Sequence, residues 1–571
     1  MKNLLFIITI LFSQVLFSQN KTVLTISYTD TPNSEPIRVK TFKDSSAVNF
    51  YLQNTKNKLI SKGYISASID SINFGDSTFA YLNKGDKYTW GNVTFAEEFE
   101  IIGKTQFQKS TKKNKEVNIN EIENKIEKTI NYFENNGYPF CSIQFKNIEY
   151  DKGIVNCHIE IQKNKQIIID SIIVKGNAKI SPKYIQRYIE IKPTDLYNEK
   201  KIVAITKKIN NLNFLNTNKE SDVLFYEDKV KIILYVDKKP SSRFDGILGV
   251  IPRDKTSGRV LLTGELNLFL VNSFARAETI GFSWSKTDNE TQKVDMIFDY
   301  PYVFNTILGV GANFNLLKQD TSYLNLRFKV LLNFILPKGN KLNFFIENKN
   351  STLLSTQQYE NSTVLPPFAD TKLTLYGLGI NSRNTDRFYS PMKGYIFYIE
   401  SSIGNKNIKK NNKLPEELYS EIDLNSLQIE SKLNFEAFIK IKKRTVLKLT
   451  NQTKYIYNEQ LFANELFRFG GLKSIRGFKE DELFADFYSV STVQLSYFYE
   501  RFSSFYLFSD FGYYESHINE FIHDTPIGVG VGADFSSKAG IFTISYAIGK
   551  QFDNAFDLQT ARIHFGYLAQ F

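Results

Sequence analysis

The chain has no long apolar run of the kind that a helical membrane protein needs. A membrane-spanning helix requires ~20 mainly apolar residues, and the stretch that comes nearest to this length is Leu4–Phe17. The mean hydropathy is also low, at -0.28. These observations exclude a bundle of transmembrane helices, although 571 residues are enough for two to four domains at ~150 residues each.

Cysteine is scarce as well, with two residues in the whole chain. So few thiols exclude a disulfide-rich scaffold. Cys141 and Cys157 flank the expected hairpin turn Asp151–Gly153, and pairing across that turn leaves them roughly 17 Å apart along the strands. A disulfide spans at most ~7 Å between Cα atoms. We therefore expect both cysteines to be buried as small apolar residues.

Phenylalanine and tyrosine are abundant, and charge and aromatic residues are unevenly distributed. The 49 Phe and 32 Tyr exclude a disordered chain. Up to residue 240 there are 35 basic and 26 acidic residues, whereas the remainder has 36 and 34. Aromatic residues number 29 in the first 240 positions and 54 in the last 331. The chain thus divides into a basic front and a nearly neutral, aromatic-rich back.

The N-terminus has the features of a secretory signal peptide. Lys2 supplies the positive charge, Leu4–Phe12 the apolar segment and Leu16–Ser18 a cleavage site. We expect residues 1–18 to be removed on export, with a short membrane anchor as the alternative. An exported protein does not meet nucleic acid, so none is expected as a partner.

The front contains one pattern three times. In each case an amphipathic helix ends at a glycine or an asparagine and strand-like runs follow. The helix ends Gly63, Gly137 and Asn213 are 74 and 76 residues apart, a period of domain size. The helices are expected to begin near Ser46, Asn120 and Asn198. The expected modules are residues 19–92, 93–163 and 164–240.

The third module resembles a known domain. Its predicted order is strand, helix, helix, strand, strand, with Ser181–Pro182 opening the first helix. This order and the phrase Val174–Ser181 resemble the polypeptide-transport-associated (POTRA) domains of outer-membrane assembly and secretion proteins. The resemblance is fullest in the third module and loosest in the first; three unrelated α+β modules are the alternative. It implies domains that dock partner chains, for example by strand addition to a sheet edge.

The back has the pattern of strands rather than helices. In Gln494–Glu500 and Ile541–Gly549, apolar or aromatic residues alternate with polar or small ones. A soluble sandwich also alternates, but its exposed face is not the aromatic one. Alternation with many aromatics is typical of a transmembrane antiparallel β-barrel. Residues 241–571 hold sixteen candidate strands, with fourteen as the alternative. The expected fold class is therefore α+β POTRA repeats followed by an all-β transmembrane barrel.

The longest connection in the predicted barrel, Glu459–Phe484, carries a second resemblance. A loop of this length is usually functional. Its motif is similar to the loop signature of the BamA-type superfamily, which includes two-partner secretion transporters, and it follows the eleventh predicted strand as in that family. The motif residues are Gly470, Gly471, Ser474, Ile475, Arg476, Gly477 and Phe478.

The resemblance implies that this loop folds into the lumen and that its arginine meets acidic residues on the next strands. The matching partners of Arg476 are Asp510 and, on the polar face of the twelfth strand, Glu500. Physical chemistry supports such a pair independently, since an arginine in a confined lumen needs a carboxylate and its planar fork binds one in bidentate fashion.

Two further features match the superfamily, and a third resembles a feature of outer-membrane barrels in general. Arg383, Pro391 and Gly394 lie between the eighth and ninth predicted strands. Gly528, Gly530 and Gly532 alternate along the fourteenth, where they predict a smooth wall for the loop; a phosphate-binding loop would need a helix to follow. The last strand carries a terminal aromatic pattern that resembles an insertion signal, formed by Phe565, Tyr567 and Phe571.

Residues for enzyme chemistry are sparse. His517 and His523 lie in a predicted loop near Glu515 and Asp524, and a metal cluster is the alternative to exposed loop residues there. No serine lies in a nucleophile-elbow context. We expect no catalytic residue, no metal and no cofactor, and therefore no enzyme.

The resemblance implies a bacterial outer-membrane protein of the surface antigen family, with its front modules in the periplasm. It would insert, assemble or translocate client outer-membrane or secreted polypeptides through a seam between its first and last strands. Outer-membrane lipid and periplasmic or lipoprotein accessory subunits are the other expected partners. The alternatives are a dedicated two-partner secretion transporter, a passive porin or receptor, and a barrel-embedded hydrolase, for which no nucleophile is found.

The loop motif leads to a first prediction. Arg476→Ala is expected to lower client export or insertion while the barrel itself stays in the membrane, because the substitution removes the residue that holds the loop. Client abundance and barrel abundance are measured in the same membranes. Normal client levels in this variant would remove the loop from the mechanism.

Overall fold

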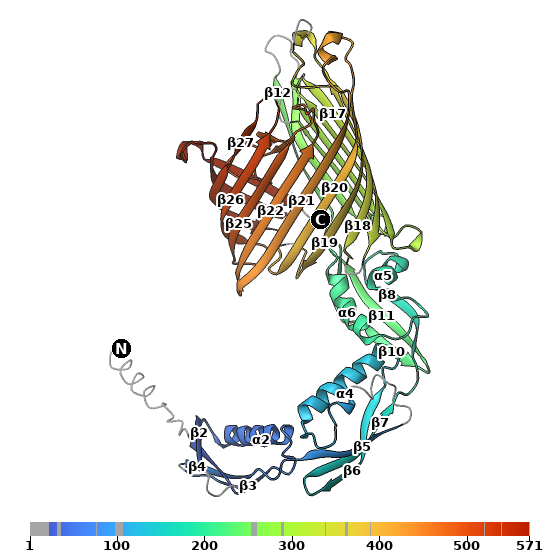
Figure 1. Ribbon diagram of the computed structural model, residues 1–571, viewed down its shortest axis with the longest axis vertical. Coiled ribbons are helices and arrows are strands. Elements are labelled where there is room, and N and C mark those ends of the chain that lie inside the picture. Colours follow the sequence, from blue (N-terminus) through green and yellow to red (C-terminus); the bar gives the residue numbers. More distant parts are fainter. Residues whose placement is uncertain are drawn as a thin grey trace, which may run out of the picture. The chain divides into compact units, whose positions relative to one another are not determined.

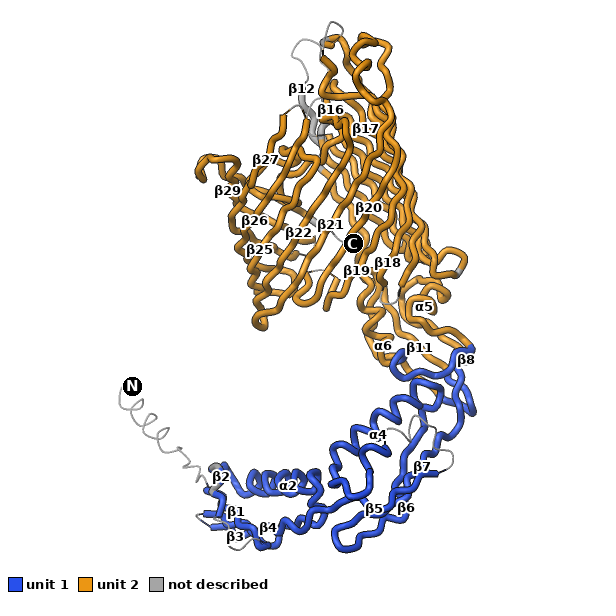
Figure 2. Tube along the Cα trace, in the orientation of Figure 1, with its two compact units in different colours: residues 1–170, 194–202, 225–230 blue, residues 171–193, 203–224, 231–571 orange. Residues whose placement is uncertain are grey.

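A computed structural model describes most of the chain (Figure 1). It forms two compact units, residues 1–170, 194–202 and 225–230, and residues 171–193, 203–224 and 231–571 (Figure 2). The expected signal peptide lies outside the described residues. The described ranges are residues 22–30, 36–75, 77–96, 107–252, 260–286, 291–336, 339–359, 364–388, 390–518, 520–537 and 540–569.

The first module is a four-stranded sheet covered by one long helix. The sheet order is β2-β1-β4-β3, with β1 and β4 parallel. The helix α2 (Ser45–Ser61) is capped by Asp44, and its apolar side chains pack on the sheet. A strand, β2, occupies the place after β1 where the third module has its first helix. The strands are β1 (Thr22–Tyr28), β2 (Ile37–Phe42), β3 (Ser68–Asn73) and β4 (Ser77–Asn83).

The second module has the sheet order β5-β7-β6 and the helix α4 (Ile119–Glu134). β5 pairs in parallel with β7, so the division expected between residues 92 and 93 falls inside a strand of this module. The helix is capped by Asn118 rather than Asn120, because the Asn118 side chain accepts from the Glu121 N–H. The strands are β5 (Thr89–Phe95), β6 (Ser142–Asp151) and β7 (Ile154–Gln162).

Both cysteines lie in the core of the second module. Cys141 and Cys157 are buried among apolar side chains, as expected. Burial raises the pKa of each thiol to about 11. Neither thiol is therefore ionised near neutral pH, and both act as small apolar residues.

The third module has the expected order, with one additional short strand. Its helices are α5 (Pro182–Ile189) and α6 (Glu199–Asn210), and its sheet order is β10-β11-β8, with β9 paired to β11. α5 contacts turns of the barrel: the Ser181 N–H donates to the Ala275 carbonyl at 2.8 Å, and the Tyr184 and Tyr302 rings lie 5.5 Å apart. The strands are β8 (Ile168–Lys175), β9 (Leu215–Thr217), β10 (Asp222–Tyr226) and β11 (Lys229–Lys238).

The joint between the first two modules is built on Gly63. Its carbonyl accepts from the Tyr88 N–H at 2.9 Å, and the Tyr88 carbonyl accepts from the Val117 N–H at 2.9 Å. Gly63 has a φ of +100°, and a Cβ on it would lie 2.4 Å from the Val117 carbonyl oxygen. This position therefore requires glycine for both conformation and space.

The next joint repeats these contacts. The Gly137 carbonyl accepts from the Ile167 N–H at 2.7 Å, and the Ile167 carbonyl accepts from the Tyr197 N–H at 2.9 Å. The ~75-residue period of the sequence thus extends to the backbone contacts that connect successive modules.

The back of the chain forms one antiparallel sheet of 17 strands in sequence order, apart from β23 and β24. β27 is a three-residue strand that pairs with β26 beyond the end of β28. Without β27, the number of strands is the sixteen expected from the sequence. The strands are β12 (Arg243–Pro252), β13 (Val260–Val271), β14 (Thr279–Lys286), β15 (Gln292–Tyr300), β16 (Leu308–Gln319), β17 (Tyr323–Ile335), β18 (Lys341–Leu353), β19 (Thr371–Thr385), β20 (Gly394–Ile408), β21 (Asn425–Lys442), β22 (Thr445–Tyr457), β25 (Phe487–Phe498), β26 (Ser504–Ser516), β27 (Ile522–Asp524), β28 (Ile527–Ser536), β29 (Gly540–Lys550) and β30 (Arg562–Ala569).

The two faces of this sheet differ as the alternation predicts. In β17, Phe328 and Val330 are each 47% exposed, whereas Lys329 between them is 9% exposed. The apolar and aromatic face points outward and the polar face inward, the arrangement of a barrel in lipid. Within the described residues, no helix is long and apolar enough to cross a bilayer.

The first joint leads to a second prediction. Gly63→Ala is expected to destabilise the contact between the first two modules by about 1–3 kcal/mol, because its Cβ meets the Val117 carbonyl and its φ becomes strained. Faster proteolysis between the modules measures the effect. Gly75→Ala is the matched control, since a Cβ there lies 3.6 Å from its nearest neighbour; equal effects in both variants would contradict this role for Gly63.

Candidate functional site: the lumen loop

The candidate site is the lumen loop, residues 458–486, which connects β22 to β25. It contains a short hairpin of β23 (Phe467–Phe469) and β24 (Leu483–Ala485). The Phe469 ring stacks on Tyr488 of β25 at 4.4 Å. The hairpin and the inner wall share an apolar core of Ile456, Phe467, Phe469, Ile475, Phe478, Leu483, Ala485, Tyr488, Val490 and Tyr514.

This hairpin was not expected from the sequence. Its strands are three residues each and lie 13 residues apart, too short for a periodicity to show. Phe467–Phe469 does alternate apolar and basic residues, but Leu483–Ala485 is apolar throughout, so the sequence carries no alternation signal for the pair.

Arg476 and Asp510 form a bidentate ion pair. Nε of Arg476 donates to Oδ2 of Asp510 at 2.8 Å, and Nη2 donates to Oδ1 at 2.7 Å. The backbone N–H of Arg476 donates to the same carboxylate at 2.9 Å. Asp510 is 0% and Arg476 7% exposed. The structure thus brings together two residues that the sequence singled out, one on the loop and one on β26.

Neighbouring side chains complete the environment of this pair. The Thr492 hydroxyl donates to Asp510 at 2.7 Å, and Gln494 accepts from Nη1 of Arg476 at 3.1 Å. The guanidinium lies 3.4 Å from the centre of the Phe508 ring, which adds a cation–π contact. Removing one partner of such a buried pair leaves a charge without compensation and costs about 3–5 kcal/mol.

The wall under the loop is built from glycines. A Cβ on Gly528 would lie 2.1 Å from the Arg476 carbonyl oxygen, and one on Gly549 would lie 2.7 Å from the Gly477 oxygen. Sequence analysis did not identify Gly549 as a wall residue, because it is the last residue of a run with ordinary alternation. Backbone therefore lies directly on backbone along this part of the wall.

Gly530 and Gly532 have a different role from the one expected. A Cβ on Gly530 would lie 2.7 Å from the Phe508 ring, and one on Gly532 2.4 Å from the Tyr506 ring. These two glycines make room for wall aromatics rather than for the loop. The Arg476 guanidinium packs on the Phe508 ring. Gly530 therefore affects the loop only indirectly, by leaving space for that ring.

The remaining motif residues shape the loop and connect it to the last strand. The Ser474 hydroxyl accepts from the Gly470 N–H at 2.7 Å, and Gly471 takes a φ of +84° at the turn. The Gly477 N–H donates to Nε2 of His564 in β30 at 3.1 Å. His564 is a further contact residue that sequence analysis did not identify.

Other predicted residues lie apart from the ion pair. Glu500 is exposed and accepts from the Ser503 hydroxyl at 3.2 Å, so the structure does not place it beside Arg476. Its position beyond the end of β25 explains this, because the inward face no longer continues there. His517 bonds Asp486 at 2.9 Å. Among the residues with assigned positions, no cluster of three His, Cys, Asp or Glu residues could hold a metal.

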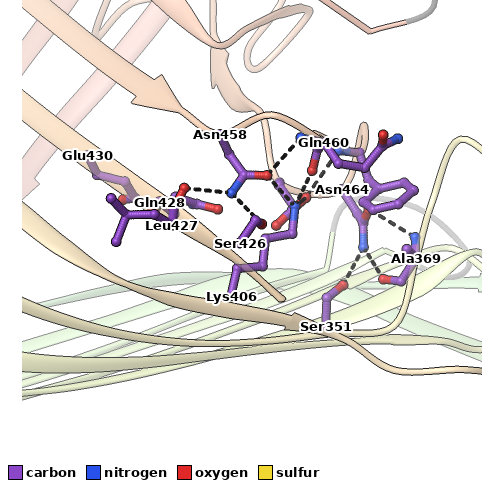
Figure 3. Close-up of polar contacts among 12 residues, drawn as sticks. Ser351, Ala369, Lys406, Ser426, Leu427, Gln428, Glu430, Asn458, Gln460 and Asn464 are labelled. Carbon is purple, nitrogen blue, oxygen red and sulfur yellow. Dashed lines mark hydrogen bonds and ion pairs between the residues drawn. The ribbon is translucent and has the colours of Figure 1, made fainter. Parts of the chain in front are cut away.

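A second set of contacts fixes the start of the loop on the other part of the wall (Figure 3). Lys406 of β20, fully buried, donates to the Gln460 carbonyl and to Glu465, each at 2.5 Å. The Asn464 amide donates to the Ser351 hydroxyl at 2.5 Å and to the Ala369 carbonyl at 2.8 Å. The loop is therefore held at two places, near its beginning by Lys406 and Asn464 and at its tip by the Arg476 pair.

The inner face carries further ion pairs. Glu400 accepts from Lys329 at 2.6 Å and from Lys432 at 2.8 Å, and Glu430 accepts from Lys349 at 2.5 Å. Gly394, at the start of β20, lies against the Asn384 carbonyl of β19, which a Cβ would approach to 1.9 Å. The interior is thus polar and internally paired.

The two ends of the sheet come together weakly. β12 contacts β30, but within the described residues no hydrogen-bonded ladder joins them and the sheet order ends at these two strands. Phe565 and Tyr567 of β30 point outward and are 61% and 37% exposed. Phe571 lies outside the described residues.

Comparison with known proteins agrees with this architecture. Residues 167–239 match the POTRA family model, described as surface antigen variable number repeat. The outer membrane protein assembly factor BamA of Buchnera aphidicola is 33% identical over 91 residues, which cover 16% of this chain and 15% of that protein. The matched segment is thus a small part of the relative's length.

Solved structures share the fold over nearly the whole chain. CdiB from Escherichia coli has a TM-score of 0.52 at 12% identity, covering 92% of this chain and 98% of CdiB. CdiB from Acinetobacter baumannii has a TM-score of 0.50 at 12% identity, covering 92% and 97%. A POTRA domain in the front of the chain, followed by a large antiparallel sheet of the barrel type, is therefore the fold of this chain.

The glycine wall leads to a third prediction. Gly528→Ala is expected to displace the lumen loop without changing any charge, because its Cβ would overlap the Arg476 carbonyl. A cost of about 2 kcal/mol raises the population of open loop roughly thirtyfold, which protease cleavage within residues 458–486 measures. Gly311→Ala is the control, since its nearest neighbour is the end of Leu331 at 3.3 Å. Unchanged cleavage in Gly528→Ala would contradict the close fit.

Proposed function

We propose that this chain, a member of the BamA-type superfamily of outer-membrane proteins, inserts or translocates client polypeptides. The observation that carries the proposal is the seam. β12 and β30 touch without a ladder among the described residues, so their backbone groups are available to a client strand at a low cost in hydrogen bonds.

The lumen loop supports the same function. Through the Gly477 N–H and His564 it contacts β30, one of the two seam strands. The Arg476 pair fixes the loop on β26, and the loop thereby supports the last strand from inside. The loop motif has a structural role in this proposal, and no covalent chemistry is assigned to it.

The POTRA modules supply the docking surfaces. Client polypeptides, and periplasmic or lipoprotein accessory subunits, are the proposed partners, with strand addition at sheet edges as the mode. A passive porin or receptor would have no use for these modules. A dedicated secretion transporter remains the second candidate, favoured by the likeness to CdiB along 92% of the chain.

Depletion separates these candidates. Removal of the protein is expected to lower the amounts of its clients in the outer membrane or outside the cell, because their strands or chains no longer pass the seam. Quantitative proteomics of both fractions is the measurement, with re-expression of the wild-type chain as the control. A broad loss of barrels indicates assembly and the loss of one secreted protein indicates a dedicated transporter; unchanged proteomes with altered solute uptake would contradict both and favour a porin.

A further inference from the structure

A lysine-rich pocket lies at the joint between the first two modules. It has a volume of ≈ 520 Å³, within the range of ligand-binding sites. Its lining combines charged side chains with the apolar side chains of Leu59, Tyr64 and Val117, which we call its floor. The residues that line this joint pocket are Leu59, Lys62, Tyr64, Lys84, Lys87, Lys115, Glu116, Val117, Asn118 and Glu121.

Two of the four lysines are neutralised within the pocket. Lys87 pairs with Glu116 at 2.5 Å, and Lys115 pairs with Glu121 at 2.8 Å. The hydrogen bond from Lys115 lowers the pKa of Glu121, so this carboxylate is charged at neutral pH. Both carboxylates of the lining are therefore already used.

The other two lysines have no such partner. In the part of the chain that the structure describes, neither Lys62 nor Lys84 forms a salt bridge. Lys84 instead lies over the Tyr64 ring at 4.4 Å, a contact that holds the ammonium group in place. The pocket thus carries a surplus of two positive charges beside an apolar floor.

The second joint shows that three of the four lysines are not needed to build such a joint. Its backbone contacts are the same, with Gly137, Ile167 and Tyr197 in the places of Gly63, Tyr88 and Val117. Counted from these matched residues, the positions of Lys62, Lys87 and Lys115 are occupied at the second joint by Asn136, Gln166 and Asp195, whereas the position of Lys84 is occupied by Lys163. Lys62, Lys87 and Lys115 therefore require another explanation than the connection itself.

We propose that the joint pocket binds an acidic segment of a partner polypeptide. Carboxylates of the segment pair with Lys62 and Lys84, and a neighbouring apolar side chain rests on Leu59, Tyr64 and Val117. The apolar floor favours a peptide over a small inorganic anion, because an anion alone would leave that surface exposed to water. The net positive charge of the front increases the encounter rate with such a segment.

This site extends the proposed function without depending on the seam or the lumen loop. Unchanged client levels on depletion, together with saturable peptide binding, would count against the proposed function alone. Loss of clients on depletion, together with no binding of the acidic peptide, would count against this site alone.

Peptide binding to the full-length protein in detergent tests the pocket. The probe is a fluorescein-labelled peptide of alternating aspartate and phenylalanine, and the matched probe has asparagine for aspartate. The acidic probe is expected to bind saturably, and Lys62→Asn with Lys84→Gln should weaken binding roughly tenfold, as the loss of charged hydrogen bonds predicts. The asparagine probe should bind no better to the wild type than to this variant.

Two control variants keep the test decisive. Lys43→Asn with Lys128→Asn removes the same charge from exposed positions outside the pocket, just before the start of α2 and on α4, and should change binding less than about twofold, since distant charges are screened. Lys62→Arg with Lys84→Arg should retain binding.

Equal weakening by both neutralising pairs, or binding unaffected by the pocket pair, would overturn the proposal. Displacement of the probe by inorganic phosphate as effectively as by unlabelled peptide would also overturn it, in favour of a small-anion site.

Discussion

A guanidinium group inside a barrel has to be matched by a carboxylate, and the Arg476–Asp510 pair meets this constraint. The pair is bidentate, buried and reinforced by the backbone N–H of Arg476. Much of the surrounding structure depends on its position. The Phe508 ring lies under the guanidinium, and Gly528 lets the loop backbone approach the wall closely enough for the pair to form.

The loop that carries this pair connects distant parts of the wall. Lys406 and Asn464 fix its beginning to β18 and β20 and the connections near them, and the arginine fixes its tip to β26. Between these points the β23–β24 hairpin packs on β25. The loop thus supports the wall from inside, and it also forms a hydrogen bond with His564 of the last strand. By contrast, no hydrogen-bonded ladder joins β12 and β30 among the described residues. A braced wall beside a weak closure is the mechanical basis of the proposed function.

Much of this arrangement could be predicted from the sequence because it depends on periodicity or on charge. Alternation along strands predicted the two faces of the sheet, and the recurring helix ends at Gly63 and Gly137 predicted the modules. Arg476 and Asp510 could be paired through the resemblance of the loop motif, and the need of a confined guanidinium for a carboxylate supports that pairing. Features set by tertiary packing were missed. The hairpin strands are too short for a pattern, β5 belongs to the second module through a parallel pairing far along the chain, and Gly549 and His564 contact the loop only after the barrel closes around it.

The central claim is that the ion pair, rather than the apolar packing of the hairpin, holds the tip of the loop. A double-mutant cycle with Arg476→Met and Asp510→Leu tests this most directly, with the free energy of loop opening measured by protease cleavage within residues 458–486. If the claim holds, each single variant opens the loop and the double variant opens it far less than the sum, with a coupling energy of about 2 kcal/mol or more. Additive effects of the two substitutions would contradict it.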